Sequence, residues 1–122
     1  MEIIDAAGRY CDPGAVGAEY VEHLRHKDLS LGTYSVRAGA TDRQGPHAED
    51  EVYVITSGQG QFTSGGQTVD VRPGSVLFVP AHEPHRFQNV ASDMAMLVFF
   101  GPAYGSRDRT TEHPGATPES SA

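Results

Sequence analysis

The sequence is poor in cysteine, in basic residues and in long apolar runs. Its single cysteine, Cys11, excludes an internal disulfide, and no apolar signal segment stands at the N-terminus, so we expect a cytoplasmic location. Nine basic residues against 16 acidic ones give a net charge of −7, and the basic residues do not cluster. Nucleic acid and anionic membranes are therefore poor candidates as partners. No stretch approaches the roughly 18 apolar residues of a membrane span.

Glycine and proline, by contrast, are frequent, with 14 and 8 residues in a chain of 122. Many turn formers between short apolar segments predict short strands joined by tight turns, such as those at 58–60 and 65–66. About seven or eight strands of this kind predict an all-β fold, a small antiparallel barrel or jelly roll. The segments that we expect to be strands are 29–39, 51–57, 61–64, 67–72, 75–80, 86–90 and 94–100.

The remaining segments lie outside this barrel. Residues 15–26 carry apolar side chains at three-residue steps, which allow a short helix there. Residues beyond 101 show no apolar periodicity. We expect an N-terminal extension over 1–28, the barrel over 29–104 and a disordered tail over 105–122.

Strand parity groups the side chains that carry chemistry. In an extended strand His47, Glu49, Glu51 and Tyr53 share one face, whereas the neighbouring acid Asp50 lies on the other. A second short segment begins with His85. Two strands could thus each aim a histidine into one interior, with a carboxylate beside one of them. Two imidazoles and one carboxylate suit a divalent transition metal and leave open positions, as in non-haem Fe(II) oxygenases; Zn, Mn, Ni or Co also suits this ligand set.

The spacing of these residues resembles the first of two signature motifs of the cupin superfamily, here in its small single-domain bacterial type. That motif runs glycine, five residues, His-x-His, three or four residues, glutamate, six residues, glycine. The matching positions are Gly39, 45, His47, Glu51 and Gly58. Every spacing fits, but Gly45 stands where the first histidine of the family belongs.

The second family motif runs glycine, five residues, Pro-x-Gly, two residues, histidine, three residues, asparagine. Gly74, Pro80, His85 and Asn89 match it, and His82 replaces the motif glycine. The resemblance covers about residues 29–101 and is more specific for the fold than for the reaction, because cupins include oxygenases, isomerases, epimerases, cyclases, storage proteins and sugar-binding regulators.

The resemblance implies that His47, Glu51 and His85 are metal ligands. Each also has a plainer interpretation. His47 could be a loop histidine bonded to a carbonyl, Glu51 a surface acid and His85 a histidine that caps a turn.

The position left open by Gly45 has several candidate substitutes. Gln44 is adjacent in sequence, Glu49 shares the parity of the ligands, Asp50 has the opposite parity, and His82 lies three residues before His85. A centre with three protein ligands is also viable, with water or substrate at the remaining positions, and complete loss of the metal is the other alternative.

The expected function is that of a metal-dependent enzyme acting on a small organic substrate. With Fe(II), the favoured ion, the site suits a dioxygenase-like reaction; with Zn or Mn it suits a Lewis-acid isomerase or cyclase. Tyr53 and Glu49 are the candidate acid–base groups. The alternatives are a binding module without turnover and a metal-free structural dimer. We expect a homodimer in any case, from the resemblance and because the edge strands need covering. The candidate cavity walls are Phe62, Phe78, Phe87, Leu97 and Phe99.

Overall fold

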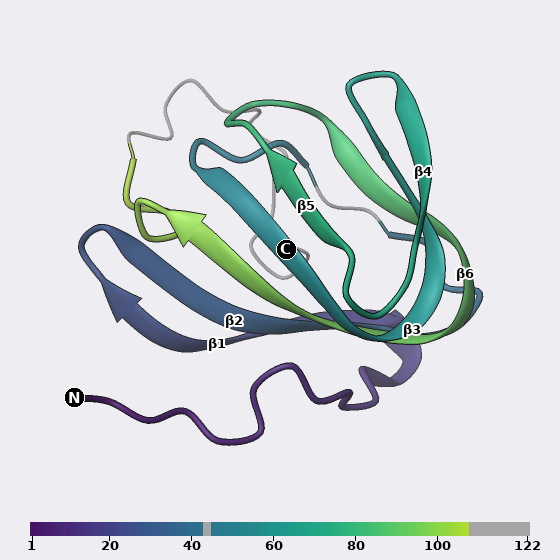
Figure 1. The fold of residues 1–122 in the computed structure, drawn as a ribbon, viewed down its shortest axis with the longest axis horizontal. Helices are drawn as coiled ribbons and strands as arrows, with labels where there is room; N and C mark the ends of the chain where they lie inside the picture. Colours follow the sequence, from purple (N-terminus) through teal and green to yellow (C-terminus); the bar gives the residue numbers. More distant parts are fainter. Residues whose placement is uncertain (43–44, 108–122) are drawn as a thin grey trace.

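The computed structural model describes residues 1–42 and 45–107, and it is almost entirely β-structure (Figure 1). Five strands follow one another in the sheet in the order β1-β2-β6-β3-β4, β5 pairs with β3, and every pairing is antiparallel. This confirms the prediction of a small antiparallel β-barrel. The strands are β1 (Ala18–His26), β2 (Leu29–Val36), β3 (Asp50–Ser64), β4 (Gln67–Val71), β5 (Val76–Val79) and β6 (His85–Gly101).

Two long strands, β3 and β6, run through both halves of the barrel and curve around it in Figure 1. The turn predicted at 58–60 is wrong, because β3 continues through it. The pairing of β3 with β6 instead shifts register between Ile55 and Gln61, so these residues form bulges that bend the strand. Gly58 lies at this bend with φ 82°, and a Cβ on it would meet Asp93 O at 2.1 Å. In the same way, the strands predicted at 86–90 and 94–100 form one continuous strand, β6. The described part of the chain therefore has six strands rather than seven or eight.

The helix allowed at 15–26 does not form. Residues 14–16 make a single 3₁₀ turn, and Ala18–His26 is strand β1, paired along its length with β2. Gly14 and Gly17 both have positive φ, which a continuing α-helix does not accommodate. Beyond the turn, inward Ala18 and Tyr20 alternate with outward Glu19 and Val21, as a strand requires. The described part of the chain has no helix with the length and apolar character that crossing a membrane would require.

The barrel interior is packed with aromatic and aliphatic side chains from the five strands β2 to β6. The candidate wall residues Phe62 and Phe87 belong to this core, whereas Phe78 is 62% exposed, which contradicts its predicted place in the cavity wall. Of the predicted C-terminal tail, residues 105–107 are described and 108–122 lie outside the described residues. The largest buried core side chains are Tyr34, Tyr53, Phe87, Phe100, Ile55, Met94 and Met96.

Candidate metal centre

The two histidines and the glutamate that the cupin resemblance implies as ligands converge inside the barrel. His47, Glu51 and His85 are all buried, and one potential ligand atom from each lies within 4.8 Å of the others. Glu51 Oε1 is 3.0 Å from His85 Nε2 and 3.9 Å from His47 Nε2. Among the described residues, this is the group of histidine, cysteine and acidic side chains whose geometry suits a metal ion.

Each of the three side chains sits where a loop meets a strand. Glu51 is the second residue of β3, His85 is the first residue of β6, and His47 precedes β3. The loop of His47 is tied to the turn before His85 by backbone bonding, since His82 N–H donates to His47 O at 2.6 Å. Asp50 ties the same two segments, because its Oδ1 accepts the N–H of Ala81 at 2.9 Å. Asp50 is not one of the three grouped side chains, in keeping with its opposite parity, and it instead fixes the loops that carry them.

One ring nitrogen of His85 has its role set by the backbone. Its Nδ1 lies 2.8 Å from Glu83 O, and because a carbonyl only accepts, Nδ1 carries the hydrogen of this bond. In the neutral imidazole Nε2 is then the lone-pair nitrogen, and it points at the Glu51 carboxylate. Metal-binding histidines are commonly oriented in this way by a carbonyl behind the ring.

Burial sets the electrostatics of this pair. It raises the pKa of the Glu51 carboxyl, against the opposing effect of the hydrogen bond and charge of His85. For His85, burial lowers the pKa, but the hydrogen bond and charge of Glu51 outweigh it and the net pKa is raised. Each group therefore favours the charged form of the other, and the two make a buried acid–base pair.

The residues fit a divalent ion. Atoms that each lie about 2.1 Å from one ion are about 3.0 Å apart at 90° and about 4.2 Å apart at 180°. The separations of 3.0 and 3.9 Å around Glu51 Oε1 fall in this range. A carboxylate oxygen facing the lone pair of a neutral imidazole at 3.0 Å is repulsive unless a proton or a cation lies between them.

The two candidate acid–base groups occupy different surroundings. Tyr53 is fully buried, packs edge-on against Phe87 at 5.0 Å and lies beside His85 at 6.0 Å between ring centroids. Burial and the charge of Glu51 raise the pKa of its hydroxyl well above the ordinary value. Glu49 is 1% exposed, as its parity predicts, but its Oε2 accepts the N–H of Gly105 at 3.1 Å and of Arg107 at 3.4 Å.

The structure describes three of the four candidates for the ligand position that Gly45 leaves open. Glu49, Asp50 and His82 do not belong to the group formed by His47, Glu51 and His85. His82 is exposed and has φ 70°, the left-handed conformation that explains the glycine of the family motif at this place. Gln44 lies outside the described residues.

Asp42 and Tyr104 are neighbours of the centre that the sequence did not indicate. Asp42 is 4% exposed; its Oδ1 accepts the Tyr34 hydroxyl and its Oδ2 accepts the Phe87 N–H, both at 2.7 Å. Its segment contains only polar and small residues in sequence, as a solvated loop does. Tyr104 packs its ring edge-on against His47, with centroids 5.3 Å apart.

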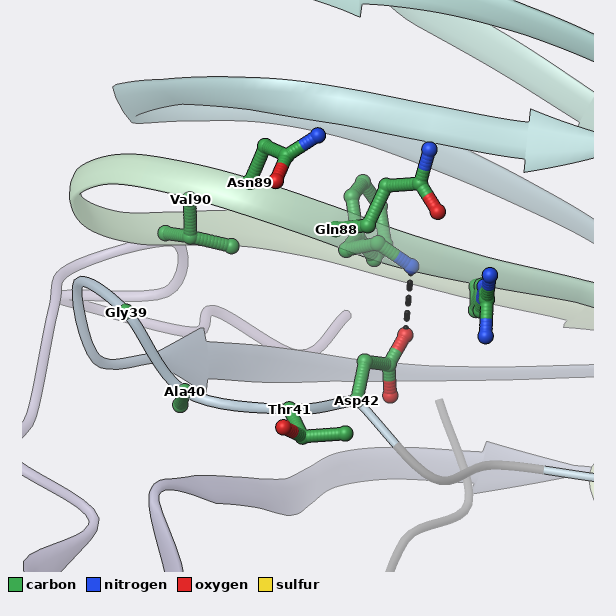
Figure 2. Close-up of a pocket in the computed structure, with 9 residues that line it drawn as sticks. Gly39, Ala40, Thr41, Asp42, Gln88, Asn89 and Val90 are labelled. Carbon is green, nitrogen blue, oxygen red and sulfur yellow. Dashed lines mark hydrogen bonds between the residues drawn. The ribbon is translucent and has the colours of Figure 1, made fainter.

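Two pockets open beside this region. One, of about 560 Å³, is lined by His85 together with Pro46, Thr63 and Pro84, and its volume suits a small organic ligand. The other, of about 320 Å³, lies between residues 39–42 and β6. Figure 2 shows Asp42 pointing across it toward β6, with the hydrogen bond to the backbone N–H of Phe87 dashed.

Comparison with known proteins agrees with this architecture. A relative in Streptomyces coelicolor, an uncharacterised protein, is 45% identical over 83 residues, which are 68% of this chain and 79% of the relative. A crystal structure of TT1209 from Thermus thermophilus matches with a TM-score of 0.73 at 24% identity, covering 84% of this chain and 99% of that one. Salicylate 1,2-dioxygenase from Pseudaminobacter salicylatoxidans matches with a TM-score of 0.66 at 18% identity, covering 71% of this chain and 27% of that one. The family model described as "Cupin domain" matches residues 32–101, so the chain belongs to the cupin family.

Proposed function

We propose that the chain is a metal-dependent cupin enzyme that acts on a small organic substrate, with His47, Glu51 and His85 as the metal ligands. The observation that carries this proposal is the alignment of His85. Its Nδ1 is bonded to Glu83 O, and its Nε2 faces a buried carboxylate oxygen at 3.0 Å. An oriented imidazole, a second imidazole and a buried carboxylate make up the ligand set of mononuclear transition-metal centres.

The favoured reaction is oxygenase-like. Two histidines and one carboxylate leave coordination positions open, and a bound Fe(II) would supply the redox chemistry that O₂ activation needs, whereas Zn²⁺ or Mn²⁺ would act as a Lewis acid. Salicylate 1,2-dioxygenase, one structure of which holds gentisate, has the same fold at 18% identity. That likeness shows the fold alone, so the reaction rests on the ligand set.

The surrounding residues prepare the site for such chemistry. The Glu83 carbonyl fixes the ring of His85, and the hydroxyl of Tyr53 interacts with Glu51. Phe100, edge-on to His47 at 5.4 Å, helps to exclude water from the ligands. The pocket beside His85 gives a substrate of modest size a way in.

Two further functions share the same site. A Lewis-acid isomerase or cyclase with Zn or Mn would use the same three ligands, and a small-ligand-binding cupin without turnover would use the same pocket. The identity of the ion separates the oxygenase from the isomerase or cyclase, and turnover separates both enzymes from the binding protein.

Elemental analysis of protein purified without added metal tests the proposal. We expect a transition metal near one ion per chain in the wild type and a loss of most of it in His47→Ala, Glu51→Ala and His85→Ala. His26→Ala is the matched control, because His26 is exposed on β1 and pairs with Glu2 at the surface. If the three ligand variants hold as much metal as the wild type and the control, the site is refuted. Iron in the wild type directs the next test to O₂ consumption with aromatic and other chelating acids, and zinc removes the main support for an oxygenase.

A further inference from the structure

The segment that follows β6 crosses the end of the barrel beside the metal ligands. We call Ala103–Arg107 the cap segment. It forms a turn closed by Ser106 N–H to Ala103 O at 3.0 Å, and Tyr104 N–H donates to Ser30 Oγ at 2.9 Å. Arg25 Nη2 donates to Tyr104 O at 2.6 Å. Side chains of β1 and β2 therefore hold the near end of the cap segment.

Glu49 holds its far end. The Glu49 side chain is buried, and its Oε2 accepts the backbone N–H groups of Gly105 and Arg107. Arg107 returns a bond to the same loop, from Nη1 to Ala48 O at 3.0 Å. A carboxylate in this position makes charge-assisted hydrogen bonds, which are stronger than those between neutral groups. Glu49 is thereby committed to the cap segment rather than to the ligands.

The cap segment touches the metal centre through one ring. Tyr104 lies edge-on to His47 at 5.3 Å and packs against Phe100 at 4.8 Å between ring centroids. Phe100 is itself edge-on to His47 at 5.4 Å. His47 is thus enclosed by two aromatic rings, and one of them is delivered by the segment that Glu49 anchors.

We propose that the cap segment, anchored by Glu49, is a positioning device that fixes His47 and limits exchange of the metal ion. Tyr104 acts through His47, and Glu49 acts through Tyr104, so both are positioning residues rather than catalytic ones. The proposal rests on the proposed metal centre. It has two parts, an anchor that exists without metal and an effect on a bound ion, and each part has its own measurement.

The anchor is tested in metal-free protein by backbone amide hydrogen exchange. In Glu49→Ala the amides of Gly105 and Arg107 lose their acceptor and should exchange faster, while those in the middle of β3 keep their protection. Glu49→Gln retains an acceptor oxygen and should restore part of the protection. Glu19→Gln, an exposed position on β1, is the matched control. Unchanged exchange at both amides in Glu49→Ala would overturn the anchor.

The effect on the ion is tested with Co²⁺, whose visible absorption reports ligand geometry. Transfer of Co²⁺ to excess chelator should be roughly 10- to 100-fold faster in Glu49→Ala and Tyr104→Ala than in the wild type, the size typical for losing groups that orient a ligand. Tyr104→Phe keeps the ring and should keep the slow rate, and its Co²⁺ spectrum should match the wild type. Equal transfer rates in Tyr104→Ala and the wild type would overturn the positioning role, whatever the exchange data show. A wild type that binds no Co²⁺ defeats both the proposed function and this role, whereas Co²⁺ binding with unchanged rates defeats this role alone.

Discussion

His85 Nε2 lies 3.0 Å from Glu51 Oε1, while Nδ1 of the same ring lies 2.8 Å from Glu83 O. The ring is therefore held from behind by a group that can only accept, and it faces a carboxylate that, when ionised, can also only accept. A proton on Nε2 or a cation between the two atoms resolves this conflict. A divalent ion that binds there would take the place of such a proton.

Binding of a divalent ion should therefore stabilise the fold. Adding Zn²⁺ or Co²⁺ to metal-free protein should raise the midpoint of thermal unfolding, because an ion that binds only the native state adds about 2.7 kcal/mol at one hundred times its dissociation constant. Glu51→Gln should show little of this increase, since it lacks the charge that attracts the ion. Differential scanning calorimetry with and without metal makes the comparison. An equal increase in wild type and Glu51→Gln would place the ion elsewhere.

The bend in β3 should depend on Gly58, which the sequence suggests as a turn residue and as the last glycine of the first motif. A Cβ on Gly58 would lie 2.1 Å from Asp93 O and 2.6 Å from Met94 Cα, and its φ of 82° disfavours any other residue. Gly58→Ala should cost about 3 kcal/mol or more in the free energy of unfolding. Gly66→Ala is the matched control, because Gly66 has φ 77° but nothing within 4 Å of its Cβ position, and we expect about 1 to 2 kcal/mol there. Urea unfolding measures both variants. If Gly58→Ala and Gly66→Ala lose the same free energy of unfolding, the backbone around Gly58 relieves the clash and the prediction is wrong.

The sequence predicts which side chains turn inward better than it predicts what those side chains contact. Parity places Glu49, Glu51 and Tyr53 on one inward face because a strand has a period of two, and all three are buried. The partner of Glu49 lies more than fifty residues further along the chain, at Gly105 and Arg107. No local pattern encodes that meeting, so a side chain with the parity of a ligand proves to hold the cap segment instead.

Two other differences between the sequence-based predictions and the structure also arise from contacts that no local pattern encodes. Glycines at 58–60 fit a turn and a bulge equally well, and only the pairing with β6 decides between them. In β5, Val76 and Phe78 share one face while Leu77 and Val79 share the other. Both faces are apolar, so the sequence does not indicate that Phe78 lies outside.

The buried phenol of Tyr34 should make the fold sensitive to alkaline pH. Burial raises its pKa far above the ordinary value, and the charge and hydrogen bond of Asp42 raise it further. The pKa in the folded state is above that in the unfolded state, so the stability that this group contributes is complete below about pH 10 and is lost as the pH rises beyond it. Between neutral and alkaline pH, Tyr34→Phe should lose less of its free energy of unfolding than the wild type loses.

Ultraviolet absorbance of tyrosinate, followed together with circular dichroism, measures this effect. Ionisation of Tyr34 should coincide with loss of the fold rather than precede it. Tyr10 is a useful comparison because it lies near the surface, so its ionisation should come before unfolding. Complete ionisation of all five tyrosines in a protein that keeps its circular dichroism would contradict the prediction.

The apolar outer face of β5 leads to a prediction about assembly. Val76 and Phe78 are 64% and 62% exposed, and their partners across the pairing with β3 are Val54 and Val52, so the four side chains form one apolar strip. Exposed apolar patches of this kind commonly mark contacts with another protein. We propose that two copies of the chain meet through this strip. The contact would remove the four side chains from water and would cover strand β5, which carries two of them. The dimer expected from the sequence would then have a defined surface.

Sedimentation velocity over a range of concentrations tests the assembly. The wild type should sediment as a dimer, and Phe78→Asp should shift it toward monomer because an unpaired carboxylate would have to be buried in the contact. Val69→Asp is the control, since Val69 is 36% exposed but lies on β4, away from the strip. Because Phe78 is exposed in the single chain, the variant should keep the circular dichroism of the folded barrel. A wild type that is monomeric at every concentration, or a Phe78→Asp variant that dimerises as strongly as the wild type, would rule out this surface.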